Sequence, residues 1–423
     1  MNSPFKGPNK IFKDKEPFKE EYTPDEILER DDLIEEYGAA LQDIIDGFGP
    51  PNIFIYGQTG VGKTATTTKM MEYLREEIAD TETSLTVISI NCNKRTSTYQ
   101  VISYIANELY DDRTIKQGTH PDTIWSLIYR RVDEIGGDFL IILDEIDKLG
   151  EDEQLLYEFP RARAMDEIEN AEIGLIGISN NFKFRENLSG RVKSTLCERE
   201  IQFSPYDANE LQTILQYYAD LTFRPDVLSE DVVPLAAALT AQDTGDARMA
   251  LDLLETAGDI ARHEEAEFVD EEHVRMARSE VDRANTRDII SERLTTQMQL
   301  TLLATTLLVI DPEREAKIKH IYSYYKDLCA QIDADTLSES RIRDHINTLE
   351  MFGLLESNEK NLGRAGGRTF IYSLVDEPRI VLETFRDDFR LVRAIPASAA
   401  RLLEQYEGET QSGFQQELGS PDE

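Results

Sequence analysis

Eight residues near the start of the chain have the types and spacing of a phosphate-binding loop. Residues 57–64 read GQTGVGKT, which fits the pattern G-x-x-x-x-G-K-[ST]. The glycines let backbone N–H groups turn toward phosphate oxygens at the positive end of the following helix. Lys63 can reach the β and γ phosphates, and the Thr64 hydroxyl can hold Mg²⁺. We therefore predict a site for ATP or ADP with Mg²⁺, formed by Gly57, Gln58, Thr59, Gly60, Val61, Gly62, Lys63 and Thr64.

Further chemically useful residues lie at the ends of two apolar segments. Asp144 and Glu145 end the run at 139–145, and Asn180 follows the run at 173–178. Parallel-sheet proteins bind ligands at the carboxyl ends of their strands, so these side chains should face the phosphate loop. Asp144 suits Mg²⁺, Glu145 suits activation of a water for attack on the γ phosphate, and Asn180 can orient that water. The alternatives are an ordinary acid pair at a helix start and a turn asparagine.

The elements that must position these residues follow from hydrophobic patterning. Short apolar runs at 52–56, 85–90, 139–145, 173–178 and 200–203 alternate with helical segments at 31–48, 98–110 and 121–135. This alternation predicts an α/β fold, with helices on both faces of a parallel sheet. From Ser204 to about residue 283 the pattern is entirely helical, beginning with a D-x-x-E capping box at Asp207 and Glu210.

The patterning divides the chain into five predicted parts. A mobile N-terminal arm at 1–20 precedes a nucleotide-binding base domain at 21–203. A helical lid follows at 204–285, and a winged-helix domain at 295–395. The last residues, 396–423, form an acidic tail that we expect to be flexible.

The third domain has side chains suited to DNA. Ser338 can cap a helix from Glu339 to about Met351, whose apolar residues fall on one face. The other face offers groups that hydrogen-bond phosphates and base edges, namely Arg341, Arg343, Asn347 and Thr348. The next loop has Arg364 and Arg368 among glycines, with no acid from 361 to 375, which suits a hairpin wing on a minor groove or backbone. The alternative is a charged helix followed by a floppy hairpin.

The overall charge is unusual for a DNA-binding protein. The chain has 82 acidic and 45 basic residues, a net charge of −37, and the acids are spread along its length. Nucleic-acid binders are usually basic, so this count alone opposes DNA binding. However, a carboxylate-coated surface keeps a protein solvated in concentrated salt, and we favour a halophilic cytoplasm over a surface that repels acidic partners.

Cysteine spacing and hydropathy limit the cellular compartments in which the protein can be expected. Cys92, Cys197 and Cys329 stand far apart, which argues against a disulfide framework and a zinc site. No apolar run approaches the roughly 18 residues of a membrane helix. We therefore expect a cytoplasmic protein without membrane contact.

Taken together, the motifs resemble those of AAA+ ATPases with a helical lid. The shared segments are GQTGVGKT, LIILDEID, GISNN, GRVKSTL at 190–196 and GDAR at 245–248. More narrowly, the chain resembles the archaeal origin-recognition and cell-division-control replication initiators over about residues 20–390. That match rests on residues 22–30, Asn91-Cys92-Asn93, ISNN with RVKS, PYDANEL and AQDTGDARMALDLLETAG. It departs at Asn181, Tyr218 and Ser189-Gly190, where the family more often has Asp, Arg and Asp-Pro.

The resemblance implies roles for further residues. Asn180 and Arg248 are similar to the first and second sensors, and Tyr206 to the lid tyrosine beside the nucleotide. Arg191 is similar to an arginine finger that acts on a neighbour's ATP. Because such a finger can be worth about 10³–10⁵ in rate, the single chain should be a weak Mg²⁺-dependent ATPase. The family also has a DNA-contacting helical insertion, here at about 96–119, with Arg113 and Lys116 as candidates.

The function implied is that of an ATP-dependent replication initiator. It would bind double-stranded origin DNA through its winged-helix and AAA+ domains, associate with other copies there, and recruit the replicative MCM helicase. Nucleotide would act mainly as a switch. One alternative is a plasmid or regulatory DNA-binding ATPase of the same build. Another is a clamp-loader-like assembly ATPase, against which the basic wing argues, and a third is a signalling ATPase whose winged helix only packs internally.

Overall fold

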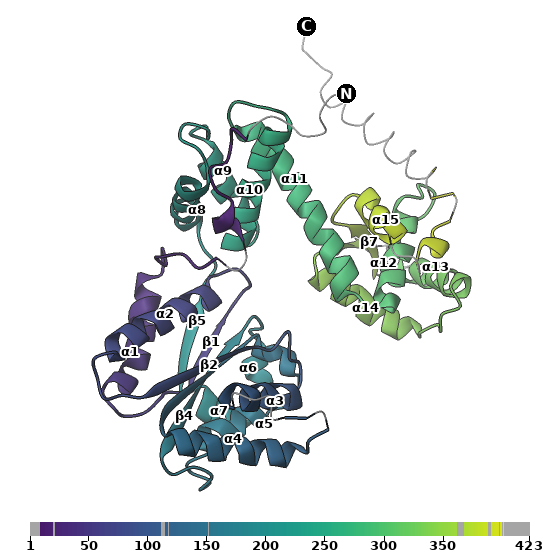
Figure 1. Cartoon of the computed structure of the whole chain (residues 1–423). Helices are drawn as coiled ribbons and strands as arrows, with labels where there is room; N and C mark the ends of the chain where they lie inside the picture. The colour runs from purple at the N-terminus through teal and green to yellow at the C-terminus, as the bar shows by residue number, and fades with distance from the viewer. Residues whose placement is uncertain are drawn as a thin grey trace. The chain divides into compact units, whose positions relative to one another are not determined.

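The computed structural model describes residues 9–19, 22–110, 115–116, 118–150, 152–361, 368–387, 391–396, 398–399 and 401. The chain forms two compact units, Met1–Ala277 and Arg278–Glu423. Helix α11 (Glu271–Asp288) begins in the first unit and ends in the second (Figure 1). Within the described residues, no helix has both the length and the apolar character needed to cross a membrane.

A five-stranded parallel sheet forms the centre of the first unit. Its strands are β1 (Ile53–Gly57), β2 (Leu85–Asn91), β3 (Gly137–Asp144), β4 (Ala171–Ser179) and β5 (Arg199–Phe203), in the order β2-β3-β4-β1-β5. All neighbouring strands are parallel, which confirms the predicted α/β class. The register pairs Asn91 with Asp144 and Tyr56 with Ser179, so the polar strand ends meet at one edge of the sheet.

Alternation along the strands explains why helices cover both faces of the sheet. In β1, Ile53 and Ile55 pack with helices α1 (Asp31–Ile45) and α2 (Lys63–Ile78), whereas Phe54 points to the opposite core. That opposite core contains α3 (Thr98–Leu109) and α4 (Pro121–Ile135) (Figure 1). Shorter elements complete the unit: η1 (Glu16–Phe18), η2 (Ile146–Leu149), α5 (Gln154–Glu158), η3 (Phe159–Arg161), α6 (Phe184–Asn187) and α7 (Gly190–Leu196).

The helical lid follows β5 in the same unit. It contains α8 (Ala208–Thr222), α9 (Val232–Asp243), α10 (Ala247–His263) and the start of α11. The predicted capping box is present at the start of α8, because the Asp207 side chain accepts from the Glu210 N–H and the Glu210 side chain accepts from the Asp207 N–H. The box satisfies amide groups that the first helical turn leaves unpaired, which fixes where α8 begins.

Residues 9–19 pack against the lid and add Ile11 and Phe12 to its core, although the sequence led us to expect a mobile arm over 1–20. Ile11 and Phe12 are each only 1% exposed, and the Phe12 and Phe223 ring centroids are 4.8 Å apart. Lys13 N–H donates to the Thr222 carbonyl at 2.8 Å. Burial of two large apolar side chains outweighs the polar, proline-containing character on which that expectation was based.

The second unit has the architecture of a winged helix. It consists of the π-helical η4 (Ile289–Arg293), α12 (Thr296–Val309), α13 (Ile318–Gln331), α14 (Glu339–Met351), the antiparallel hairpin β6 (Leu355–Asn361) and β7 (Arg368–Leu374), α15 (Pro378–Asp387) and η5 (Val392–Ala394). The sequence predicted α14 and a hairpin wing. It gave no bounds for β6, whose sequence LESNEKN lacks the apolar alternation of a strand. Tyr325, Ile342 and Ile346 are fully buried between its helices.

Candidate nucleotide-binding site

The phosphate loop has a backbone conformation that glycine adopts readily and other residues rarely adopt. Gly60 and Gly62 have φ values of 71° and 88°, in the left-handed region. A Cβ atom on Gly60 would lie 1.7 Å from Asp246 Oδ1, and one on Gly62 would lie 2.8 Å from the Tyr206 hydroxyl. The loop therefore approaches the lid closely while its amides lie at the N-terminus of α2. This is the cradle that a phosphate group requires.

Lys63 lies inside this loop and is 5% exposed. Its ammonium donates to the carbonyls of Gly57 at 3.1 Å and Gln58 at 2.5 Å. Burial lowers its pKa to about 8, and the nearby Asp144 carboxylate is the largest opposing influence. A bound phosphate would add negative charge at the same point and favour the charged lysine.

Thr64 and Asp144 come together as the sequence predicts. The Thr64 hydroxyl donates to Asp144 Oδ2 at 2.9 Å. Burial raises the pKa of Asp144, and the hydrogen bond from Thr64 opposes that rise. No group of three or more His, Cys, Asp or Glu residues that could hold a metal occurs in the described part of the chain. A hydroxyl and a carboxylate fit Mg²⁺, which is usually bound by few protein ligands together with substrate phosphates.

Glu145 and Asn180 also meet across two strands. The Asn180 amide donates to Glu145 Oε1 at 3.4 Å, while Glu145 Oε2 is buried with no hydrogen-bond partner among the described residues. Burial, followed by the adjacent Asp144 charge, raises the pKa of Glu145. An unsatisfied buried carboxylate oxygen beside a phosphate cradle is suited to accept a proton from a water.

Asp147 is a positioning residue that sequence reasoning missed. Its Oδ1 accepts from the Ser179 hydroxyl at 2.9 Å and from the Asn180 N–H at 3.2 Å. These bonds tie η2 to the end of β4 and hold Asn180 opposite Glu145. The sequence signal for Asp147 was its place as the last acid of LIILDEID, three residues after Asp144.

The lid and the base domain line one cavity of about 660 Å³, which contains Lys63, Thr64, Asp144, Glu145, Asn180, Tyr206 and Arg248. Ala247 N–H donates to the Gly60 carbonyl at 3.0 Å, so the start of α10 contacts the loop directly. The positive charge of Arg248 opposes the rise in the Glu145 pKa. The structure thus brings together the loop, the acid pair, the strand-end asparagine and both lid residues that the sequence singled out.

The other end of the cavity is aromatic and apolar. Tyr22 and Tyr218 have ring centroids 6.0 Å apart in an edge-to-face arrangement, and Tyr217 lies beside Tyr218. Ile214 and Leu251 line the same region. Flat apolar walls suit a nucleobase. No base-binding residue was predicted from the sequence. The available signals were Tyr22, at the start of the motif segment 22–30, and Tyr218, at the lid position where the family more often has arginine.

Arg191 does not line this cavity. It is exposed at the start of α7, with its guanidinium 4.7 Å from the centre of the Tyr157 ring. An arginine that acted on this chain's own nucleotide would have to lie in the cavity. The role of Arg191 as a finger toward a neighbour therefore stays a prediction.

The predicted DNA-contacting residues are partly described. Arg341, Arg343 and Asn347 are exposed on α14, and Arg343 donates to Glu339 on the same helix at 2.7 Å. The Thr348 hydroxyl donates to the Asp344 carbonyl at 2.9 Å. Lys116 is exposed, and Arg368 pairs with Asn361 in the β6–β7 hairpin. The positions that lie outside the described residues are Arg113, Arg364 and the side chain of Arg368.

The fold and the site define an AAA+ ATPase-type module joined to a winged helix. Family models agree: the AAA domain matches residues 46–180, the Cdc6 AAA+ ATPase-type lid domain matches 212–279, and the CDC6 C-terminal winged helix domain matches 290–384. This confirms the predicted combination of a parallel-sheet nucleotide-binding domain, a helical lid and a winged helix.

Comparison with whole proteins gives the family. The chain is 44% identical to ORC1-type DNA replication protein 8 of Haloarcula marismortui over 412 residues, covering 96% of this chain and 93% of the relative. It is 41% identical to the protein of the same name from Halobacterium salinarum over 392 residues, covering 92% and 98%. The chain belongs to the family of ORC1-type DNA replication proteins, which confirms the resemblance, and the haloarchaeal relatives agree with a salt-adapted composition.

A solved relative extends the match to three dimensions. The structure of the Aeropyrum pernix ORC1 protein in complex with DNA superimposes with a TM-score of 0.78 at 33% identity, covering 91% of this chain and 99% of that chain. The similarity therefore spans the AAA domain, the lid and the winged helix.

Proposed function

We propose that this chain is an ATP-dependent replication initiator that binds double-stranded origin DNA and recruits the replicative MCM helicase. The observation on which the proposal depends is the single cavity in which phosphate loop, acid pair and lid residues meet, in a chain that also has a winged helix. The solved complex of the A. pernix ORC1 protein with DNA supports the DNA-binding part. MCM recruitment rests on the family resemblance.

The residues of the cavity support binding and slow hydrolysis of ATP. The loop amides and Lys63 would hold the phosphates, and Thr64 and Asp144 would hold Mg²⁺, which neutralises phosphate charge when bound. Asn180 would orient a water so that its oxygen attacks the γ phosphorus, and Glu145 would take the proton while ADP leaves. Arg248 would contact the phosphates from the lid.

Arg191 would act on the nucleotide of a neighbouring copy rather than on that of its own chain. Its exposed position at α7, outside the cavity lining, supports this assignment. A single chain would then hydrolyse ATP slowly and hold its nucleotide mainly as a switch. Copies assembled side by side on DNA would hydrolyse faster, because each would receive an arginine from the next.

Recovery of bound genomic fragments at high salt, with and without ATP, tests the proposal. We expect enrichment of fragments that share an origin repeat. Substitution of Arg341→Glu should lower the affinity by about tenfold or more, since a phosphate or base-edge contact is worth about 1–3 kcal/mol. Arg275→Glu is a matched control, because Arg275 is an exposed helical arginine in the lid, paired with Glu271. Equal recovery of random fragments, or an unchanged affinity of the Arg341 variant, would contradict the proposal.

A further inference from the structure

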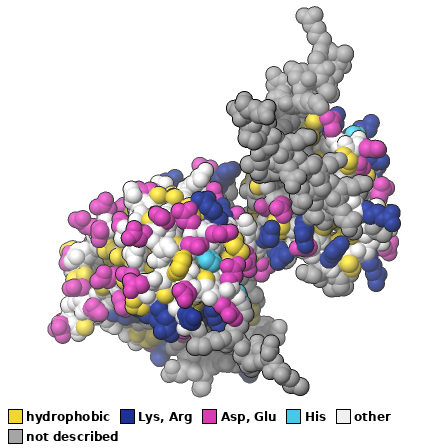
Figure 2. All heavy atoms as spheres, turned by 90° about the horizontal axis from the view of Figure 1, so that it is seen from above, with side chains coloured by type: hydrophobic (Ala, Val, Ile, Leu, Met, Phe, Trp, Pro, Cys, Tyr) yellow, Lys and Arg dark blue, Asp and Glu magenta, His cyan; other side chains and the backbone are white. Residues whose placement is uncertain are grey.

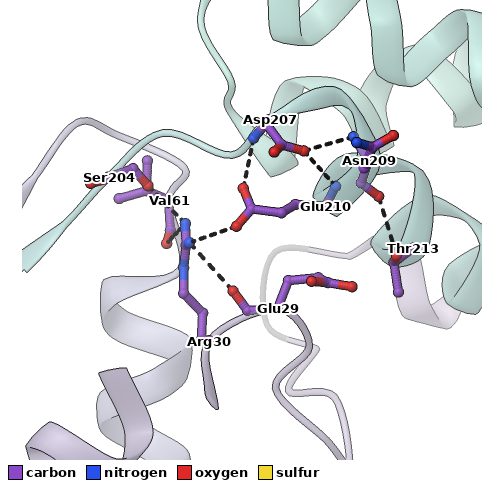
Figure 3. A network of polar contacts seen from close by, with 8 residues as sticks. All are labelled: Glu29, Arg30, Val61, Ser204, Asp207, Asn209, Glu210 and Thr213. Atoms are coloured by element: carbon purple, nitrogen blue, oxygen red, sulfur yellow. Dashed lines mark hydrogen bonds and ion pairs between the residues drawn. The ribbon is translucent and has the colours of Figure 1, made fainter. Parts of the chain in front are cut away.

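A buried arginine outside the predicted site links the phosphate loop to the lid. Arg30 directly precedes helix α1 and is 6% exposed. The Arg30 cluster is Arg30 together with Val61, Ser204, Tyr206 and Glu210. Figure 3 shows these residues except Tyr206. A buried guanidinium is costly unless it is paired and hydrogen-bonded, so its partners identify what holds it in place.

On the base side, the guanidinium contacts three backbone carbonyls, and the nearest in sequence is that of Glu29, to which Nη1 donates at 3.4 Å (Figure 3). Its Nη2 donates to the Ser204 carbonyl at 2.8 Å and lies 3.5 Å from the Val61 carbonyl. Val61 is the fully buried centre of the phosphate loop, and Ser204 is the first residue after β5, where the chain leaves the sheet for the lid. One planar group therefore joins the loop to the connection between base and lid.

On the lid side, the same group contacts two side chains. Arg30 Cζ is 3.5 Å from the centre of the Tyr206 ring, and its Nη1 is 3.8 Å from Glu210 Oε1. The other oxygen of Glu210 accepts from the Asp207 N–H at 2.7 Å, within the capping box that starts α8 (Figure 3). The Tyr206 hydroxyl in turn lies next to Gly62. The cluster thus closes a ring of contacts from the loop to the first lid helix and back to the loop.

We propose that Arg30 is a positioning residue that couples nucleotide at the phosphate loop to the orientation of the lid. A phosphate that orders the loop also orders the Val61 carbonyl, which holds the guanidinium and through it Tyr206 and Glu210. The inference rests on the proposed nucleotide site and adds the route by which occupancy of that site reaches α8. Lysine would not replace arginine here, because a single ammonium cannot stack on Tyr206 and reach three carbonyls and a carboxylate at once.

Hydrogen exchange of the full chain, measured with and without ADP and Mg²⁺, tests the coupling. In the unsubstituted protein, ADP should slow exchange in both loop 57–64 and helix α8. In Arg30→Met, ADP should still slow exchange in the loop, whereas the slowing in α8 should fall at least about fivefold, the lower end of measured couplings between sites. Arg30→Lys should show little more of the ADP-dependent slowing in α8 than Arg30→Met does.

Two further variants keep the test decisive. Arg199 also bonds two backbone carbonyls and an acid, Asp43, but all of these lie in the base domain, so Arg199→Met should keep the α8 response.

If Arg30→Met does not fold, Glu210→Gln replaces it in the experiment. The new glutamine weakens the contact with Arg30, while its amide oxygen can still accept from the Asp207 N–H and keep the start of α8. A normal α8 response in Arg30→Met or Glu210→Gln at saturating ADP would overturn the inference. An absence of slowed exchange in loop 57–64 of the unsubstituted protein would instead overturn the nucleotide site, and the coupling with it.

Discussion

Glu145 has a left-handed backbone, with φ of 54°, directly after strand β3. Non-glycine residues adopt this conformation rarely, at a cost of about 1–3 kcal/mol. The sharp turn lets two adjacent carboxylates reach different partners, because Asp144 contacts Thr64 while Glu145 contacts Asn180. The backbone conformation at this point therefore separates the two carboxylates to which we assign different roles, Asp144 in holding Mg²⁺ and Glu145 in accepting a proton.

Substitution of Glu145→Gln should separate binding from hydrolysis. The amide keeps the size of the side chain but cannot accept the proton of the attacking water. We expect nucleotide affinity within about threefold of normal and a hydrolysis rate lower by about 10²–10⁴, the usual contribution of a general base. Phosphate release and titration with a fluorescent ATP analogue measure the two effects.

The control for this substitution is Glu172→Gln. Glu172 is a carboxylate on β4 that pairs with Arg163 at the surface of the base domain, away from the cavity lining. Its variant should hydrolyse ATP at the normal rate. Hydrolysis by Glu145→Gln at that same rate would remove Glu145 from the mechanism.

At the scale of elements, the lid is completed by a segment that lies some 200 residues away in sequence. Lys13 N–H and Asp14 N–H both donate to the Thr222 carbonyl, and Arg224 N–H donates to the Ile11 carbonyl. The aromatic rings of residues 12, 18 and 223 pack together, over a glycine in α10. The segment at 9–19 therefore acts as a further packed layer of the lid.

The glycine beneath these rings should not tolerate a methyl group. A Cβ on Gly258 would lie 2.4 Å from Phe12 Cζ and 2.7 Å from Phe223 Cε1. We expect Gly258→Ala to destabilise the lid by about 1–3 kcal/mol through overpacking. The readouts are a lower melting temperature and faster tryptic cleavage at Lys13 and Lys15, which the displaced segment would expose.

Gly38→Ala is the matched control, because it makes the same change in the interior of another helix, α1. There the added Cβ would meet only Met70 Cε at 3.8 Å, an ordinary contact. Alanine favours a helix over glycine by about 0.5–1 kcal/mol, so the melting temperature should rise or stay constant. Equal effects of the two substitutions would contradict the packing argument.

At the scale of the whole molecule, charge and DNA binding must be reconciled. The chain has a net charge of −37, and Figure 2 shows acidic side chains spread over the visible described surface with lysine and arginine between them. Several arginines are paired with acids, including Arg343 on the proposed DNA-reading helix. A chain of this kind in concentrated salt cannot rely on many phosphate contacts, since the entropic gain from counterion release fades as salt rises.

We therefore expect a weak dependence of DNA affinity on salt. A plot of log affinity against log salt for an origin duplex should have a slope shallower than about −4, the value for roughly four phosphate contacts. Fluorescence anisotropy across a series of KCl concentrations measures it, with a random duplex of equal length as the control. A slope near −10, typical of strongly electrostatic binders, would show that phosphate contacts dominate after all.

The sequence by itself determined the parts of the site whose signals are local. The phosphate loop, the five strands, the acid pair and the strand-end asparagine follow from motif and apolar period, because a loop or strand is specified by consecutive residues. Sequence pattern also located α14 and the capping box of α8. In each case the prediction needed only neighbours within a few positions.

Tertiary structure decided which distant residues meet. The contact of Arg30 with Glu210, the packing of Phe12 under the lid and the tyrosine wall at Tyr22 and Tyr218 join segments far apart in the chain. No periodicity encodes such pairs, since they form only when the sheet and lid have folded and burial compensates the ordering of the N-terminal segment. For the same reason β6, polar in sequence, is a strand only because β7 pairs with it.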